Sequence, residues 1–274
     1  MTQDAIDSAN ADKQTGQTSS SPSLSNLQAS TIEGVIKSLD LIVSWSLENN
    51  KRTGYFAALY RKVTIRVKEG IEEGKFDDAA RMEKLDVIFA NRYLEAFEQY
   101  ITKQPMTSAW QLAFDKTEKW EPIVFQHLML GMNAHINLDL GIAAAQTTVP
   151  EDLPQLKNDF DKINALLGSM VNETQNELSE IWPAFKYIDK FSGSLDESIA
   201  DISMKIARNL AWKVAEEYSQ TKEDCQDEFI KTTDCAVRLA GSVFSSPGWR
   251  LRLVMLAIRL TERTNVAKTI QILS

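Results

Sequence analysis

Apolar residues recur at every third or fourth position through most of residues 30–274, and no segment alternates between apolar and polar residues as a half-buried strand would. Proline and glycine breaks and two capping-box sequences, which start at Ser30 and Ser194, mark where helices begin and end. Helices are predicted over about 31–49, 56–70, 77–101, 122–145 and 154–182, around Trp110, from 195 to 214, and in two more segments broken at 245–248. The chain is therefore expected to be all-α.

One predicted helix, residues 122–145, contains no Lys, Arg or Glu and has apolar residues on every side. A helix of that kind is buried at the centre of a bundle rather than exposed on one face. No internal repeat and no Gly- or Ser-rich linker interrupts residues 30–274. We predict a single multi-helix, bundle-like domain of eight to ten helices over 30–274, built around this central, nearly uncharged helix.

The N-terminal residues 1–29 contain six serines and no aromatic residue, and they lack the apolar stretch of a signal peptide. Such a segment cannot bury enough apolar surface to fold, so we predict a disordered polar tail. Cys225 and Cys235 are the only cysteines, which excludes a disulfide framework. We interpret them as buried free thiols and expect a cytoplasmic protein.

The 274 residues have a net charge of −8, which argues against a nucleic-acid partner because such partners require a basic face. Residues 249–274 run against this balance with a net charge of +4, which leaves −12 for the rest of the chain. A basic, apolar C-terminal helix suits contact with an anionic membrane surface. The favoured interpretation is that it packs against the acidic remainder of the chain.

The predicted helix over 77–101 carries two carboxylates, Glu83 and Asp86, within its apolar arc. Arg81, Lys84, Arg92, Glu95 and Gln99 share the opposite face, which we interpret as solvated. A buried carboxylate must be paired, protonated or bound to a metal. Pairing with Arg208 or Arg61 in an internal salt bridge is the structural alternative to a functional role.

The central helix carries two polar stripes and both histidines of the chain. His135 and Asp139 are four residues apart, so their side chains can meet on one face. Asn133 and Asn137, with Gln126, form the second stripe. His127 is eight residues from His135, about 12 Å along the axis, so the two imidazoles cannot bind one ion together.

The His135–Asp139 spacing suits two metal ligands, or an imidazole held in one tautomer by a carboxylate. With carboxylates from the helix over 77–101, such a set would suit a divalent iron, manganese or zinc ion. The same pair also suits a satisfied hydrogen bond in the core. The sequence contains no HExxH, GxSxG, Walker A or GxGxxG motif, so no nucleotide site is expected.

Four blocks of sequence occur in order: GYFAALYRKVT from Gly54, FDDAARMEKLDVIFANRYLEAF from Phe76, QHLMLGMNAHINLDLGIAAA from Gln126, and DFDKINALL from Asp159. Together they resemble a bacterial family catalogued as domain of unknown function 5995, over about residues 31–220. The resemblance implies a bacterial cytoplasmic protein and brings no catalytic assignment. The positions it carries over are Arg81, Glu83, Asp86, Asn91 and Arg92 in one block and His127, Asn133, His135, Asn137 and Asp139 in another.

The leading hypothesis is an enzyme that acts on a small molecule at a buried polar site between the helices over 77–101 and 122–145. In it, His135, Asp139 and His127 are catalytic, or His135, Asp139, Glu83 and Asp86 bind a metal, and Arg81, Asn91, Asn133 and Asn137 complete the polar core. A metal-free acid–base enzyme is the second form of this hypothesis. The alternative is a non-catalytic helical binding or scaffold protein whose buried polar residues fix the packing and whose basic C-terminal helix docks a partner.

Overall fold

The computed structural model describes residues 24–183, 195–246, 248–262 and 265–274. Most of the predicted N-terminal tail, and Ser194 of the second capping box, lie outside them. The structure is 82% helical and has no strand in the described residues, so the all-α class is confirmed. These residues form eleven α-helices, more than the eight to ten predicted. The excess arises because the segment over 122–145 is split and the C-terminal segment ends in a helix of its own.

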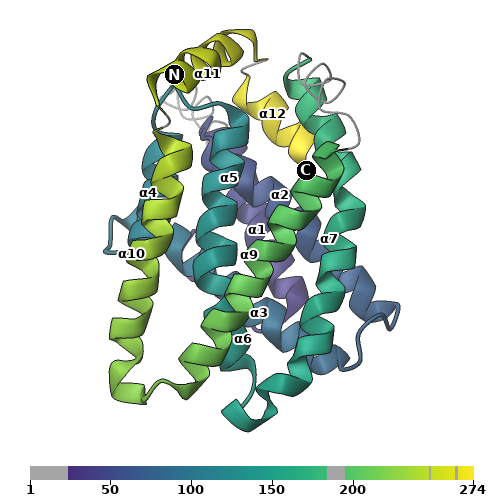
Figure 1. The fold of residues 1–274 in the computed structure, drawn as a ribbon. Coiled ribbons are helices and arrows are strands. Elements are labelled where there is room, and N and C mark those ends of the chain that lie inside the picture. Colours follow the sequence, from purple (N-terminus) through teal and green to yellow (C-terminus); the bar gives the residue numbers. More distant parts are fainter. Residues whose placement is uncertain (1–23, 184–194, 247, 263–264) are drawn as a thin grey trace, which may run out of the picture.

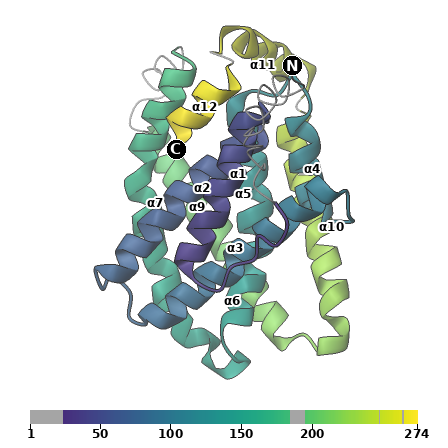
Figure 2. The same ribbon diagram turned by 180° about the vertical axis from the view of Figure 1, so that it is seen from behind.

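The long helices pack side by side in a bundle, and α11 lies across one end of it (Figures 1 and 2). Their bounds are α1 Ile32–Glu48, α2 Thr53–Glu72, α3 Ala79–Thr102, α4 Ser108–Thr117, α5 Val124–Ala134, α6 Gly141–Thr147, α7 Leu153–Ile181, α9 Leu195–Gln220, α10 Gln226–Ser245, α11 Trp249–Thr261 and α12 Val266–Leu273. A π-helical segment, His135–Leu140, joins α5 to α6. Short 3₁₀ turns at Pro150–Asp152 and Glu223–Cys225 precede α7 and α10.

The rod formed by α5, the π-helical segment and α6 is central, since it contacts α2, α3, α4, α9 and α10. Two of its glycines allow this close packing. A Cβ atom on Gly131 would lie 2.4 Å from the ring of Phe56, and one on Gly141 would lie 2.5 Å from the carbonyl oxygen of Ala211. The uncharged segment is therefore the core of the bundle, as its pattern predicted.

Four helices begin at a carboxylate that comes from a distant part of the chain. The first backbone N–H groups of a helix have no partner within it, so an acceptor there is stabilising. The pairs are Glu83 with Ile32 N (3.2 Å) at α1, Asp159 with Asp77 N and Asp78 N (2.7 and 3.0 Å) at α3, Asp234 with Ser108 N and Ala109 N (2.7 and 2.8 Å) at α4, and Glu262 with Val124 N (2.9 Å) at α5. These carboxylates hold the helix ends in register.

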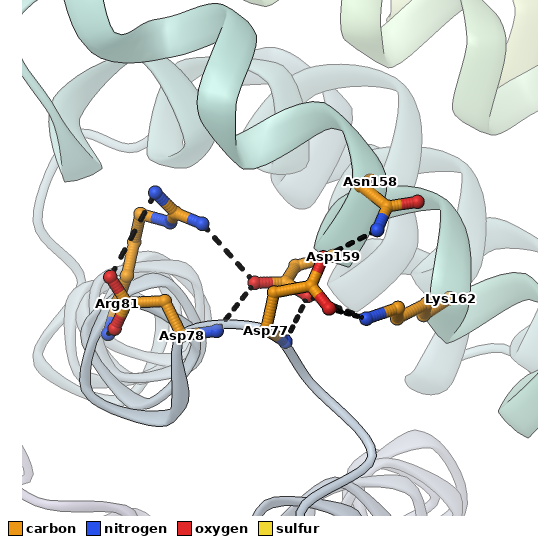
Figure 3. Close-up of polar contacts among 6 residues, drawn as sticks. All are labelled: Asp77, Asp78, Arg81, Asn158, Asp159 and Lys162. Atoms are coloured by element: carbon orange, nitrogen blue, oxygen red, sulfur yellow. Dashed lines mark hydrogen bonds and ion pairs between the residues drawn. The ribbon is translucent and has the colours of Figure 1, made fainter.

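Figure 3 shows the most elaborate of these contacts, around the fully buried Asp159 on α7. Besides the two backbone N–H groups, Asp159 accepts a hydrogen bond from Arg81 (3.2 Å) and lies 3.4 Å from the Lys162 ammonium group. Lys162 and Asn158 also bind Asp77. Two of the sequence blocks, FDDAAR and DFDK, therefore meet here to fasten the start of α3 to α7.

The two cysteines of the C-terminal half differ from the expectation. Cys225 and Cys235 are exposed, so the interpretation of buried thiols was wrong. The reason is that α10 turns Asp234, Val237 and Gly241 inward, which leaves Cys235 on the outer face.

In the described part of the chain, no helix is both long enough and apolar enough to cross a bilayer.

Candidate functional site

A cavity of about 100 Å³ lies between α2, α3, the π-helical segment, α7 and α9. Its wall is mostly apolar and includes Phe56, Leu59, Met82, Phe89, Ile136 and Leu167. Four polar residues also line it: Tyr60, Asp86, His135 and Arg208. An apolar cavity of about 150 Å³ is enough to hold benzene, so this one has the size for a very small organic molecule. Such an apolar pocket with a few polar groups is typical of a ligand site.

His135 enters this cavity from the π-helical segment, where the uniform α-helix expected over 122–145 is interrupted. π-helical turns are rare and occur frequently at functional sites. The imidazole is stacked on the ring of Phe89, with centroids 3.6 Å apart and planes at 8°, and the ring of Tyr60 meets it edge-on at 4.4 Å. These aromatic contacts fix the orientation of the imidazole.

Asp139 lies behind His135 and is itself fully satisfied. Its Oδ1 accepts a hydrogen bond from Arg92 Nε (2.8 Å), and its Oδ2 accepts one from Trp110 Nε1 (2.8 Å) and lies 3.4 Å from His135 Nδ1. Burial works to raise the pKa of Asp139, but Arg92, His135 and Trp110 outweigh it and hold that pKa below its ordinary value. Asp139 is therefore a carboxylate that positions the imidazole.

The protonation state and the tautomer of His135 follow from this environment. Burial lowers its pKa, and the neighbouring Asp139 offsets only part of that effect, so the imidazole is neutral. The carboxylate beside Nδ1 favours the tautomer with the proton on Nδ1, which leaves Nε2 as a hydrogen-bond acceptor. Nε2 is buried and has no hydrogen-bond partner among the described residues. His135 thus offers an unused basic nitrogen in the wall of the cavity.

Asp86 is the second unsatisfied group in the cavity wall. Burial, followed by the negative charge of Glu83, raises the pKa of Asp86 to about 7. Its Oδ2 is buried with no hydrogen-bond partner in the part of the chain that the structure describes. The alternative of a salt bridge with Arg208 or Arg61 finds no support there, because Arg61 pairs with Asp40, and Arg208 donates to the carbonyl oxygen of Phe160 at 2.6 Å.

Tyr60 adds a third unsatisfied group that the sequence pattern did not single out. Its hydroxyl is buried without a hydrogen-bond partner in the described residues. Burial, with the nearby carboxylates Asp86 and Asp139, raises its pKa well above the ordinary value, so the hydroxyl stays protonated. In sequence, Tyr60 is one member of an apolar helical stripe, and nothing in that stripe distinguishes a wall residue from a packing residue.

The predicted metal-binding set is only partly brought together. Asp86 and His135 line one cavity, and Asp139 contacts His135, but Glu83 turns away to bind the backbone at the start of α1. Within the described ranges, no group of three or more His, Cys, Asp or Glu side chains is arranged to hold a metal ion. The unpaired polar atoms of Asp86 and His135 in the cavity wall are better suited to hydrogen bonding and proton transfer than to forming a complete set of metal ligands.

His127 lies apart from this cavity. It is buried beside Tyr55, with ring centroids 5.7 Å apart, and neither ring nitrogen has a hydrogen-bond partner among the described residues. Burial, followed by the charges of Arg52 and Arg259, lowers its pKa to about 3. His127 therefore packs as a neutral aromatic ring in a different layer from His135, as their separation along the helix predicted.

The other predicted polar residues bind the chain itself. Arg81 holds Asp159, and Asn91 exchanges two hydrogen bonds of 2.8 Å with the backbone of Ala29. Asn133 donates to the carbonyl oxygen of Val237 (2.9 Å) and accepts from Asn137 (3.0 Å), which ties the central rod to α10. These contacts join separate elements of the bundle, and none of the four residues lines the cavity.

The prediction that one face of the helix over 77–101 is solvated was partly wrong. Arg92, assigned to it, is mostly buried and binds Asp139. Arg92, Trp110 and Asp139 also line a separate, open cleft of about 480 Å³ on the bundle surface. The His135–Asp139 pair therefore lies between the apolar cavity and this polar cleft.

The fold and the site together define an all-α bundle with a small, mostly apolar cavity and unsatisfied polar groups in its wall. The chain matches the family of unknown function DUF5995 over residues 32–247, more than half of its length, and it belongs to that family. The resemblance seen in the four sequence blocks is thus confirmed and extends beyond residue 220. No curated protein and no solved structure matches the chain.

Proposed function

We propose that this protein is an enzyme that transfers protons on a small, mostly apolar molecule held in the cavity, with His135 as base and Asp86 as acid. The observation that carries the proposal is that both side chains line one cavity and keep buried polar atoms that have no hydrogen-bond partner among the described residues. An unsatisfied buried polar group costs about 1–3 kcal/mol, so a fold retains several in one place only at a compensating benefit.

The protonation states suit this division of roles. Neutral His135 accepts a proton at Nε2, and Asp139 stabilises the imidazolium that forms. Asp86, with a pKa of about 7, holds a proton that it gives to another atom of the bound molecule and becomes a carboxylate. Transfer of a proton from the imidazolium to the carboxylate, through solvent, restores the starting state. The protonated hydroxyl of Tyr60 supplies a hydrogen bond to an oxygen of the molecule.

The cavity wall also limits the substrate class. A volume of about 100 Å³ with mostly apolar walls suits a neutral molecule of a few carbon atoms that carries one carbonyl or hydroxyl oxygen. A charged molecule would lose its hydration, while Arg208, the cation that the described residues place in the wall, already donates to the backbone.

Deuterium incorporation into a ketone small enough for the cavity, such as acetone in D₂O, tests this proposal. Catalysed exchange of the protons beside the carbonyl group, followed by NMR, should be lost in His135→Gln and Asp86→Asn. It should persist in Asn137→Ala, a half-buried polar residue of the same rod that does not line the cavity. Equal rates in all four proteins would remove the support for His135 and Asp86 as the acting pair.

A non-catalytic binding role is the second candidate, favoured by the many polar residues that only bind the backbone. On that reading the cavity holds a ligand without turnover. Binding of acetone to the wild type, measured as a rise in melting temperature, with no proton exchange in any protein, would favour it over the enzyme.

A further inference from the structure

Helix α11 is attached to the bundle mainly at its C-terminal end. Arg259 donates to the carbonyl oxygen of Trp120 (2.7 Å) and binds the carboxylate of Glu262 (3.1 Å), which in turn accepts from the backbone of Val124 (2.9 Å). Arg259 and Glu262 are both buried. The helix therefore has a fixed anchor and lies across one end of the bundle (Figures 1 and 2).

Beyond that anchor, α11 exposes large apolar side chains. Trp249, Leu253 and Leu260 are 70%, 59% and 68% exposed, and Leu256 is exposed beside them. At 100° per residue, these four side chains share one face of the helix. Leu251 and Val254, on the opposite side, are 50% and 54% exposed. Isolated exposed apolar residues are ordinary, but a contiguous apolar face on a single helix marks an interaction surface.

The charge around this face is basic. Helix α11 has no acidic residue, and Arg250 and Arg252 are exposed on it. Lys116 and Lys119 of the neighbouring segment line a groove shared with Trp249 and Arg252, and they outnumber the one acidic residue in the lining of that groove, Glu121. The rest of the chain is strongly acidic, with a net charge of −12 outside residues 249–274. An anionic surface would therefore be attracted to this end of the bundle.

We propose that α11 docks the protein onto an anionic lipid bilayer, lying in the plane of the surface. Apolar side chains of one face would enter the boundary between headgroups and acyl chains while the basic side chains meet lipid phosphates. At 13 residues the helix is too short to span a bilayer, which needs about 20.

A second copy of the chain fits this face less well. A two-fold interface brings each surface patch against itself, so the exposed arginines of α11 would face their own copies with no acidic residue on either helix to balance them. A lipid surface supplies the missing negative charge at every position.

Flotation of the full-length protein with vesicles tests the proposal. We expect binding to vesicles of phosphatidylcholine with 30% phosphatidylglycerol and about ten-fold weaker binding to phosphatidylcholine alone. Trp249→Glu with Leu253→Glu should abolish binding, and Arg250→Glu with Arg252→Glu should weaken it about ten-fold or more. These side chains are exposed, so the variants should keep the wild-type circular dichroism and melting temperature.

The matched control is Ile206→Glu with Leu210→Glu, a second pair of apolar residues on α9 that are four apart and more than half exposed. It should bind vesicles like the wild type. The proposal is overturned if the wild type does not float with anionic vesicles, or if the Ile206/Leu210 control loses binding as fully as the Trp249/Leu253 variant. It is also overturned if light scattering shows that the wild type and the other variants are dimers while the Trp249/Leu253 variant is a monomer.

Discussion

Replacing Asp86 with asparagine gives a direct test of the cavity's electrostatics, because it requires no knowledge of a substrate. The side chain is almost fully buried, and its pKa is about 7 in the folded protein against an ordinary value of 3.8. Between these two values the folded state keeps the proton while the unfolded chain has lost it. Below about pH 4 the raised pKa of Asp86 has no effect on the unfolding free energy. As the pH rises from about 4 toward 7, it lowers the unfolding free energy progressively.

The size of the effect follows from that difference. Each pH unit over which only the folded state holds the proton costs the native protein about 1.4 kcal/mol. Between pH 5 and pH 8 the wild type should lose about 3 kcal/mol through Asp86, since the loss levels off above pH 7. Asn cannot ionise, so Asp86→Asn should gain about 3 kcal/mol over the wild type in going from pH 5 to pH 8.

Urea unfolding of both proteins at half-unit pH intervals, followed by circular dichroism, measures this difference. Asp115→Asn, an exposed aspartate on α4, is the matched control and should follow the wild type at every pH. If the stability curves of the wild type and Asp86→Asn stay parallel from pH 5 to pH 8, Asp86 is not a proton-holding group, and the acid of the proposed mechanism is lost.

Three further outcomes follow from the same packing. Nitrogen-15 NMR should show both histidines neutral at pH 7.5, with His135 carrying its proton on Nδ1; a protonated His135 at that pH, or a proton on its Nε2 instead, would contradict the role assigned to Asp139. Gly141→Ala should lower the unfolding free energy by about 2 kcal/mol or more, because the new methyl group would collide with the backbone of α9, and unchanged stability would refute that close approach. Glu83→Gln should move the pH midpoint of the Asp86 effect downward, since it removes a negative charge that raises the pKa of Asp86; a double-mutant cycle with Asp86→Asn should show coupling at pH 8 and none at pH 5.

The periodicity of the sequence was sufficient for the fold class, the central uncharged helix and the His135–Asp139 contact, because each depends on spacing along one helix. It failed where partners come from elsewhere in the chain. Arg92 lies opposite the main apolar arc of α3, yet it binds Asp139 because α3 is covered on more than one side. The π-helical segment has no proline or other break in the sequence to announce it. Tyr60 was hidden within an apolar stripe.

The carboxylates show why burial alone could not identify a site from the sequence. Glu83 and Asp86 are three residues apart in one apolar arc and were predicted to act together. The structure separates them, because Glu83 reaches the backbone at the start of α1, as Asp159, Asp234 and Glu262 do at α3, α4 and α5. In a bundle, every helix start offers unpaired N–H groups, so a buried carboxylate has a structural use wherever one lies within reach. Asp86 Oδ2 has no such contact in the described part of the chain, and it lines a cavity with an equally unsatisfied imidazole. The lack of a structural partner makes Asp86 a candidate for chemistry because it is combined with a place in the cavity wall, which His127 does not have.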